Sequence, residues 1–334
     1  MLAINGTGRI GLCTARLIGQ RNDVELAAIN TTASIDTLVH LLKYDSVHKN
    51  YNSIDGSFDV KKIDEETISI GNSKHIKILS NRDARELDFS KYGATCVIEC
   101  TGKFNSFESS KVHLRDNIKK VVISAPADNV PMYVYGVNHS SYKGENIVSN
   151  ASCTTNCLAP IIKVLHKEFG VESGLMTTIH SYTNDQNILD VKHKDIRRAR
   201  AAAINIIPTS TGAAKSIGLV IPELNGKLNG VAIRVPTPDV SLVDLSAKLS
   251  KKVTIESINQ AFLEAENSYM KGIILNDLEK RVSSDFIGST YSAILIPDKT
   301  IVVDDTNIKV LAWYDNEVGY SHRLIDLSMY VLNN

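Results

Sequence analysis

Short apolar runs alternate with amphipathic stretches along the first half of the chain. The short runs predict strands, whereas apolar residues that recur every three or four positions predict helices. The run at 94–99 is nearly continuous, which is typical of a strand buried on both faces of a sheet. This succession predicts an α/β domain with a parallel, doubly wound sheet, with strands at 2–5, 24–30, 94–99 and 120–124 and helices at 10–18, 35–44 and 108–118.

The pattern changes near residue 175, where strand-like runs come closer together and helical stretches become fewer. A helix is expected at 255–270, behind Thr254 as its N-cap, and another amphipathic stretch covers 319–332. We place the boundary between two domains near 149–153, so that the first comprises 1–152 and the second 153–317. The second is predicted to be an α+β domain with a mixed, mostly antiparallel sheet, from strands at 175–183, 230–235, 240–249, 291–296 and 308–314.

Composition and charge exclude several classes of protein. The 334 residues are 43% hydrophobic and 22% charged with a formal net charge of zero, which argues against disorder and against a general nucleic-acid binder. Five cysteines in so long a chain are not expected to form a disulfide scaffold. The N-terminus lacks the pattern of a secretory signal, and no stretch approaches the ~18 apolar residues of a membrane span. We therefore expect a cytoplasmic protein with reduced cysteines.

Gly6, Gly8 and Gly11 form a G-x-G-x-x-G motif between the first predicted strand and the first predicted helix. In a Rossmann-type dinucleotide site, such glycines permit a tight turn, close approach of the pyrophosphate and packing of the helix on the strand. The alternative is a glycine-rich surface turn. An NAD site usually has an acidic residue at the end of the second strand, but here Thr31 follows Asn30. Without that carboxylate, the site would not repel a 2′-phosphate.

Cys153 lies in the polar segment 149–157, at the expected start of an amphipathic helix. A helix N-terminus stabilises a thiolate, so Cys153 is a candidate nucleophile, whereas Cys157 lies one turn further on and is interpreted as structural. His180 ends an apolar strand and is the candidate base, although nine histidines are present and separation in sequence says little about proximity. A metal site at the two cysteines would need two more ligands, and none stands at a typical spacing.

Two features of the second half predict anion binding. Residues 208–215 place hydroxyl groups and Gly212 immediately before a helix, whose N-terminus favours negative charge. Arg234 lies in a predicted strand, and a basic cluster contains Arg198. Such a cluster is either a solvated surface or, opposite a phosphorylated substrate, a clamp.

Motifs from Ile4 to about Leu327 resemble the family of phosphorylating glyceraldehyde-3-phosphate dehydrogenases. The most specific are SNASCTTNCLAP around Cys153 and WYDNEVGYSHR near the C-terminus, and the others include INGTGRIG, ECTGKF, HSYTNDQ and IIPTSTGAAK. The resemblance implies oxidation of glyceraldehyde 3-phosphate to 1,3-bisphosphoglycerate in glycolysis and gluconeogenesis, through a cysteine thioester that inorganic phosphate attacks. It also implies a homotetramer, and a C-terminal helix at 318–334 that completes the first domain.

The resemblance also implies roles for individual residues. Cys153 would be the nucleophile and His180 the base. The implied cofactor-binding residues are Gly6, Gly8, Arg9, Ile10, Gly11, Thr31, Arg82, Thr101, Ser124, Lys192, Asn316 and Tyr320. Inorganic phosphate would bind at Ser152, Thr154, Thr211 and Gly212, with Arg198 nearby. The phosphate of the substrate would bind at Thr183 and Arg234, with Asp185 orienting the arginine.

The chain departs from the family pattern around the cofactor. Thr7 and Leu12 stand where the family usually has phenylalanine and arginine. Thr31 replaces the acid of the second strand, and Val191-Lys192 replaces a Leu-Pro pair common in NAD-specific members. The last two changes favour acceptance of NADP beside NAD. The alternative is that Thr31 is a neutral replacement and Lys192 a solvated side chain.

Other functions stay open at this point. Erythrose-4-phosphate dehydrogenase shares the cysteine, the histidine and the fold, but its members lack the STGAA segment present at 210–214. A semialdehyde dehydrogenase has a similar architecture, but paired anion sites argue against it. The non-enzyme alternative is a binding protein that has kept a Rossmann shell, for which the complete set of reactive positions favours only a secondary role.

Overall fold

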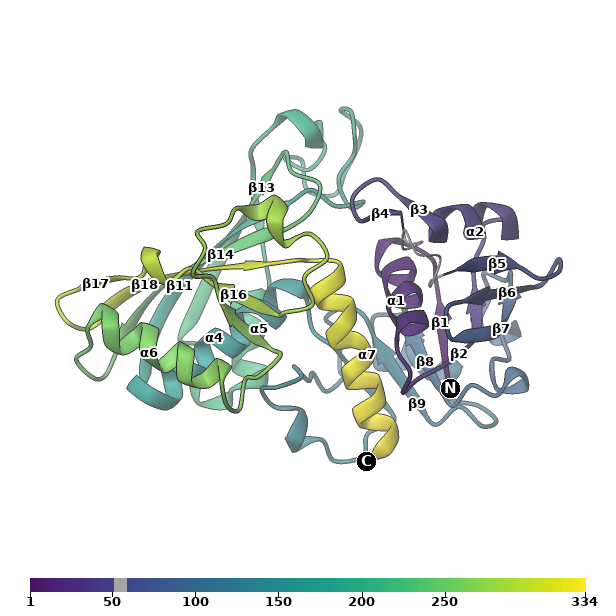
Figure 1. The fold of residues 1–334 in the computed structure, drawn as a ribbon, viewed down its shortest axis with the longest axis horizontal. Coiled ribbons are helices and arrows are strands. Elements are labelled where there is room, and N and C mark those ends of the chain that lie inside the picture. The colour runs from purple at the N-terminus through teal and green to yellow at the C-terminus, as the bar shows by residue number, and fades with distance from the viewer. Residues whose placement is uncertain (51–58) are drawn as a thin grey trace. The chain divides into compact units, whose positions relative to one another are not determined.

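The computed structural model describes residues 1–50 and 59–334, which separate into two compact units (Figure 1). Unit 1 comprises residues 1–135, 139–152 and 321–334, and unit 2 comprises residues 136–138 and 153–320. The chain therefore enters unit 2 at Cys153 and returns to unit 1 at Ser321.

The sheet of unit 1 has eight strands in the order β10-β9-β8-β1-β2-β7-β6-β5. Neighbouring strands from β10 to β7 run parallel, and β6 and β5 are added antiparallel. The parallel, doubly wound sheet predicted from the sequence is confirmed, but the strands β5, β6 and β7 between residues 60 and 79 were not predicted. The strands are Leu2–Asn5 (β1), Leu26–Asn30 (β2), Val60–Lys62 (β5), Thr67–Ile70 (β6), Ser73–Leu79 (β7), Cys96–Glu99 (β8), Lys120–Ile123 (β9) and Ile147–Ser149 (β10).

Helices cover the apolar faces of this sheet. They are Arg9–Gln20 (α1), Ile35–Lys43 (α2), Phe107–Ser110 (α3) and, from Ser321 onward, the greater part of Val318–Asn333 (α7). Leu324 and Leu327 of α7 share one buried cluster with Leu2 and Ile4 of β1, so the C-terminal helix packs into the core of unit 1. A short hairpin, Tyr44–Asp45 (β3) and Lys49–Asn50 (β4), follows α2.

The helix predicted over 108–118 is wrong. The α-helix α3 ends at Ser110 and continues only as the 3₁₀ turn Lys111–His113. Asp116 then adopts a φ of 53°, a left-handed backbone that a right-handed helix does not accommodate. The apolar residues of this segment recur at helical spacing, but beyond His113 they pack from a loop. Periodicity alone does not distinguish such a loop from a helix.

The sheet of unit 2 has the order β12-β13-β11-β14-β18-β16-β15, and β17 also pairs with β18. Only the pairs β11 with β13 and β15 with β16 are parallel, which confirms the mixed, mostly antiparallel sheet. The strands are Val171–Ser181 (β11), Ile207–Ser210 (β12), Leu228–Val235 (β13), Ser241–Leu249 (β14), Ile274–Asn276 (β15), Ala293–Leu295 (β16), Ile301–Val303 (β17) and Asn307–Tyr314 (β18).

Three α-helices belong to this unit: Cys153–Phe169 (α4), Ala213–Val220 (α5) and Ile255–Glu266 (α6). Helix α4 is buried along most of its length and contacts β14, β11, α5 and α6 (Figure 1). Thr254 caps α6 as predicted, because its side chain accepts a hydrogen bond from the Ser257 N–H at 3.2 Å. The helix ends at Glu266, earlier than the predicted residue 270, and turns follow.

Candidate active site

Unit 2 brings Cys153 and His180 together. Cys153 is the first residue of α4, His180 is the next-to-last residue of β11, and Sγ lies 3.5 Å from Nε2. The Nδ1 atom of His180 lies 2.7 Å from the carbonyl oxygen of Ser181 and 3.0 Å from Nη1 of Arg234, which itself donates to that carbonyl. We assign the ring proton to Nδ1 because the carbonyl oxygen, the closer of the two partners, can only accept. The lone pair of Nε2 therefore faces the thiol. This geometry is that of a nucleophile with its general base.

Burial acts on both members of the pair. It raises the pKa of the Cys153 thiol and lowers that of His180 to about 3. The positive charge of Arg234 partly offsets burial at the thiol and adds to it at the imidazole. Hydrogen bonds from the backbone at the start of α4 act against burial and lower the pKa of the thiol, and the expectation that the helix start favours the thiolate stays a prediction. A proton transfer within the pair creates both charges at once, and these charges stabilise each other.

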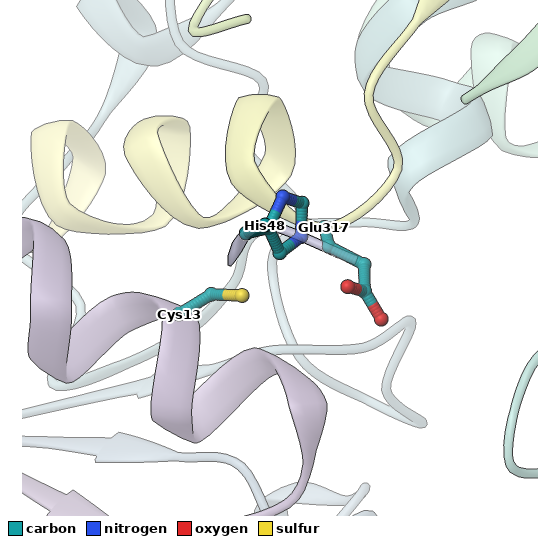
Figure 2. Close-up of side chains that lie close together, drawn as sticks. All are labelled: Cys13, His48 and Glu317. Atoms are coloured by element: carbon teal, nitrogen blue, oxygen red, sulfur yellow. The ribbon is translucent and has the colours of Figure 1, made fainter. Parts of the chain in front are cut away.

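The five cysteines are free thiols, and four of them are poor nucleophile candidates. Burial raises the pKa of Cys96 and of Cys100 to about 12, and that of Cys157 well above its ordinary value. Cys13 is buried on α1 in unit 1, where His48 also belongs, while Glu317 precedes α7 in unit 2 (Figure 2). Cys153 is distinguished by its facing base and the nearby guanidinium of Arg234.

Arg234 lies on β13 directly opposite His180 of β11 in the parallel ladder. Its Nη1 donates to the carbonyl oxygen of Ser181 at 2.9 Å and lies 3.4 Å from Oγ1 of Thr183. Its buried Nε has no hydrogen-bond partner among the residues that the structure describes. A buried cation beside a hydroxyl group, with an unused donor, is suited to an anionic group.

Asp185 occupies a different place from the one predicted. Its carboxylate accepts a hydrogen bond from Nη1 of Arg198 and lies 3.5 Å from Nε2 of His193, so it orients Arg198 rather than Arg234. Arg198 also donates through Nε to Oγ1 of Thr209 at 3.0 Å. The loop after β11 places Asp185 next to the segment that carries Arg198. Arg234, by contrast, lies within strand β13.

Arg198 also donates to the carbonyl oxygen of Ser210, within the predicted anion segment 208–215. Thr211 accepts a hydrogen bond from the Ala213 N–H, and Gly212 is the N-cap of α5 with open space where a side chain would stand. This end of α5 therefore presents backbone N–H groups next to a guanidinium, as an anion site requires. Thr154 is one residue into α4, and Ser152 is the last residue of unit 1 before that helix.

Tyr314 is a residue of this site that the sequence analysis missed. Its buried hydroxyl lies 2.9 Å from both Thr154 Oγ1 and Thr178 Oγ1, and its ring meets that of His180 edge-on. It thereby ties the start of α4 to β11, the two elements that carry Cys153 and His180. Tyr314 belongs to the WYDNE motif, in which Asn316 was the predicted cofactor residue. Nothing in the spacing of this motif distinguished Tyr314 from a core residue.

Asn316 and Tyr320 are both buried in unit 2, after β18. The Oδ1 atom of Asn316 accepts hydrogen bonds from the hydroxyls of Ser181 and Ser241 at 2.8 and 2.7 Å, which orients its amide nitrogen as a donor. Lys192 is exposed on the loop after β11.

Unit 1 contains a separate cleft of about 380 Å³ at the carboxyl ends of β1, β2 and β8. Of the predicted cofactor residues, Gly6, Gly8, Thr31, Arg82 and Thr101 line it. The charged side chains among its described lining residues are two cations, Arg82 and Lys103. Such a cleft at the strand ends is the usual place of a nucleotide in a doubly wound sheet.

The glycines of this loop meet steric requirements. Gly6 has a φ of 101°, and a side chain there would collide with Thr101, while a side chain at Gly11 would collide with the carbonyl oxygen of Gly6. Nothing lies within 4 Å of the place where a Cβ at Gly8 would stand, which leaves the backbone open to a ligand. The residues present therefore fit a dinucleotide pyrophosphate.

Other predicted cofactor residues surround this loop. Arg9 begins α1 together with Ile10, and its guanidinium pairs with Asp45. Ser124 follows β9, and its hydroxyl contacts the Cys100 thiol. Thr31 is buried, lies 2.5 Å from the hydroxyl of Thr7, and accepts a hydrogen bond from the Ala33 N–H. Thr31 is thus engaged within the protein.

The low pKa of His180 predicts a pH dependence of stability. Above its ordinary value of 6.5 the ring is neutral in both folded and unfolded chains, whereas below it only the unfolded chain binds a proton. Stability therefore falls as the pH drops from 6.5 toward 3. Between pH 7 and 5, the free energy of unfolding of the native protein should decrease by about 2 kcal/mol more than that of His180→Asn. Urea unfolding at both pH values measures this, and equal pH dependences would contradict the assignment of a buried neutral imidazole.

A nucleotide cleft in one unit and a cysteine–histidine pair beside a guanidinium in the other define a dinucleotide-dependent dehydrogenase with a cysteine nucleophile. The NAD-binding domain of glyceraldehyde-3-phosphate dehydrogenase matches residues 1–107, and the C-terminal domain of the same family matches residues 152–316. The chain belongs to the glyceraldehyde-3-phosphate dehydrogenase family, and the resemblance stated from the sequence is confirmed.

The relatives cover the whole chain. Glyceraldehyde-3-phosphate dehydrogenase 1 of Bacillus cereus is 50% identical over 99% of this chain and 98% of its own length. The enzyme of Geobacillus stearothermophilus is also 50% identical, over 99% of this chain and 97% of its own. The chloroplastic GAPB protein of Arabidopsis thaliana is 49% identical over 98% of this chain and 73% of its own. Within residues 1–50 and 59–334, no helix combines the length and the hydropathy of a membrane span.

Proposed function

We propose that this protein oxidises glyceraldehyde 3-phosphate to 1,3-bisphosphoglycerate, with inorganic phosphate and a nicotinamide dinucleotide, and that it also catalyses the reverse reaction. The observation that carries the proposal is the alignment of Cys153 Sγ with the unprotonated Nε2 of His180 at 3.5 Å. The family membership supports the same reaction.

In the first half of the reaction, Cys153 attacks the aldehyde carbon and forms a hemithioacetal. His180 takes the thiol proton, returns it to the oxygen of the adduct, and then accepts this hydroxyl proton as the hydride leaves, because its lone pair faces the sulfur. A nicotinamide bound in the cleft would supply the acceptor for this hydride, and the product on Cys153 is a thioester. Inorganic phosphate then attacks the thioester and releases the acyl phosphate and the thiolate.

The anion sites have separate tasks in this proposal. Arg234 and Thr183 bind the phosphate of the substrate. Ser152, Thr154, Thr211 and Gly212 bind inorganic phosphate with Arg198, which Asp185 orients. The positive charge of Arg234 lowers the pKa of His180, so an anion bound to that guanidinium raises the basicity of the imidazole. Substrate binding thereby strengthens the base that the reaction needs.

For the cofactor, we propose that NADP is accepted beside NAD. The two cations of the cleft, Arg82 and Lys103, attract a 2′-phosphate, and the strand end carries Thr31 instead of a carboxylate. Because the Thr31 hydroxyl is already bonded inside the protein, its contribution is the absence of repulsion rather than a direct contact. Lys192 of a neighbouring copy supplies a further cation, and Ser124, Asn316 and Tyr320 bind the nicotinamide side.

Thr31→Asp tests this preference. The new carboxylate would repel a 2′-phosphate and accept hydrogen bonds from the ribose hydroxyls of NAD. The ratio of kcat/KM for NADP to that for NAD should fall about tenfold or more, since each 1.4 kcal/mol of differential binding is a factor of ten. Steady-state kinetics with both cofactors measure the ratio. The matched control is Thr37→Asp, which adds the same charge at an exposed position of α2 outside the cleft and should leave the ratio unchanged. Negligible NADP turnover in the native protein beside strong NAD turnover would contradict the proposal.

We further propose a homotetramer in the cytoplasm. The segment after β11 exposes several large apolar side chains, among them Ile188 at 82% and Leu189 at 74% exposure, and a second copy of the chain would cover such a surface. Sedimentation equilibrium measures the mass of the assembly. A monomer at micromolar concentration would overturn this part of the proposal.

The direct test of the reaction is a steady-state assay with glyceraldehyde 3-phosphate, with and without inorganic phosphate, in the presence of each cofactor. Reduction of the cofactor that depends on phosphate supports the proposal. A clear preference for erythrose 4-phosphate would instead support the related dehydrogenase. A secondary binding role beside catalysis would survive alkylation of Cys153, whereas the enzymatic activity would not.

A further inference from the structure

A carboxylate without solvent contact lies beneath the nucleotide cleft of unit 1. Glu99, the last residue of β8, is 1% exposed and accepts hydrogen bonds from four donors. One oxygen accepts from the N–H and the hydroxyl of Thr101, the N–H at 2.7 Å. The other accepts from Nδ2 of Asn5 at 2.6 Å and from Nε2 of His113 at 3.1 Å. The groups of Thr101 and Asn5 are donors, and Nε2 of His113 donates when it carries the ring proton, so a carboxylate satisfies all of them.

This carboxylate fixes the direction of a chain of hydrogen bonds. Asn5 must turn its amide nitrogen toward Glu99, so its Oδ1 faces the other way and accepts from Nδ2 of Asn30 at 2.8 Å. Asn30 in turn presents its Oδ1 to the N–H of Asn81 at 3.0 Å. Each amide therefore has the orientation that the previous one requires, and the chain ends at a backbone N–H, which cannot reverse.

This chain of hydrogen bonds ends at residues that line the nucleotide cleft. Asn81 leads directly into Arg82, and the Asn30 side chain also donates to the carbonyl oxygen of Asn81 at 2.8 Å. On the other side, the His113 ring meets Phe104 edge-on. Six residues of the network and its neighbours line the cleft: Asn5, Asn30, Asn81, Arg82, Thr101 and Phe104.

We propose that Glu99 is a positioning residue for the cofactor: through Asn5 and Asn30 it fixes the hydrogen-bond direction that holds the loop at 81–82 against the nucleotide. The proposal rests on the use of this cleft for the dinucleotide. Glu99 itself lies below the cleft lining and does not contact the ligand. Its effect is on binding and not on the reaction at Cys153, which belongs to the other unit.

Glu99→Gln replaces one acceptor oxygen by a donor nitrogen at nearly constant side-chain volume, so the side chain no longer accepts on both sides. A glutamine that keeps its oxygen toward Thr101 turns its nitrogen toward Asn5, where it meets another donor. Asn5 can flip, and Asn30 can flip after it, but the Asn30 nitrogen would then face the Asn81 N–H. In every arrangement of the amides of Asn5 and Asn30, one buried N–H group faces another donor and has no acceptor. The hydrogen bonds that hold the loop at 81–82 are therefore weakened.

The experiment measures the dissociation constants of NAD and NADP by calorimetry on the full-length protein. Glu99→Gln should weaken both about tenfold, which corresponds to one unpaired buried donor. In turnover, KM for the cofactor should rise while kcat at saturation and iodoacetamide labelling of Cys153 stay near native values. Glu108→Gln on α3 is the matched control, because its carboxylate is 74% exposed and pairs with Lys111 at the surface.

A second variant separates positioning from mere structural support. Asn30→Asp alone places a carboxylate against Oδ1 of Asn5 and should also weaken binding. In the double variant Glu99→Gln/Asn30→Asp, the chain can run in reverse: the new glutamine donates to Asn5, Asn5 donates to the new carboxylate, and that carboxylate accepts from the Asn81 N–H. The net charge is unchanged. Two bonds are not restored: the one from residue 30 to the Asn81 carbonyl, and the one from Nε2 of His113, which now faces the glutamine nitrogen. The double variant should therefore bind NAD several-fold more tightly than the two separate losses predict when added.

Additive losses in the double variant would overturn the proposal, as would native affinity in Glu99→Gln. If Glu99→Gln does not fold alone, the comparison of Asn30→Asp with the double variant still decides the point, because only a directional chain makes the second substitution beneficial. Failure of the proposed reaction is recognised separately: a native protein that binds NAD but does not oxidise the aldehyde would contradict the proposed function and leave this inference intact.

Discussion

Cys153→Ser is expected to abolish oxidation of glyceraldehyde 3-phosphate, with kcat lowered on the order of 10⁴-fold or more. An alcohol at this position remains un-ionised at neutral pH, and the shorter bond to oxygen moves the nucleophilic atom away from His180, which already lies 3.5 Å from the sulfur. An ester intermediate would also react with phosphate more slowly than a thioester. Steady-state assays and the loss of iodoacetamide labelling measure the effect.

Cys157→Ser provides the control for this experiment. Its side chain is buried one turn further along the same helix, and burial raises its pKa well above the ordinary value of a thiol. This variant should keep most of its turnover and lose some stability, because it exchanges a buried thiol for a more polar hydroxyl. Substantial turnover in Cys153→Ser would show that another residue is the nucleophile.

The sequence predicted the fold well where the burial of an element also determines its pattern of apolar residues. Buried strands such as β8 are continuous apolar runs because both faces are covered, and α1 has helical spacing because one of its faces packs on β1. The helix predicted over 108–118 failed because a left-handed residue, Asp116, breaks a segment whose spacing looks helical. The strands β5, β6 and β7 were missed because polar side chains interrupt their short apolar patterns.

The candidate site was predicted unevenly for a related reason. Residue types and motifs pointed to Cys153 and His180, but their contact depends on how α4 meets β11, which no local pattern encodes. The resemblance implied Arg234 as the partner of Asp185, whereas the structure pairs Asp185 with Arg198. The path of the loop after β11 determines this partner, and no local pattern encodes that path. Tyr314 and Glu99 act through other residues, and buried groups of this kind look like ordinary core or strand positions in a sequence.

His180→Asn is expected to lower kcat by about 10²–10⁴-fold, the usual effect of removing a general base. An asparagine can replace the hydrogen bond to the Ser181 carbonyl but cannot accept a proton. Burial raises the pKa of Cys153, so a thiol without its facing base should be ionised only at more alkaline pH. The variant should therefore react more slowly with iodoacetamide than the native protein at pH 7, and its labelling rate should rise with pH.

The two readouts separate the two tasks of the imidazole. Higher pH should restore labelling of Cys153 in His180→Asn, because hydroxide can remove the thiol proton. It should restore turnover much less, because the hemithioacetal still lacks a positioned base when the hydride leaves. His75→Asn, at an exposed position of β7, is the matched control and should leave both unchanged. Native labelling at pH 7 in His180→Asn would show that the thiol is activated without this histidine, and Arg234, whose charge favours the thiolate, would then be the group to replace next.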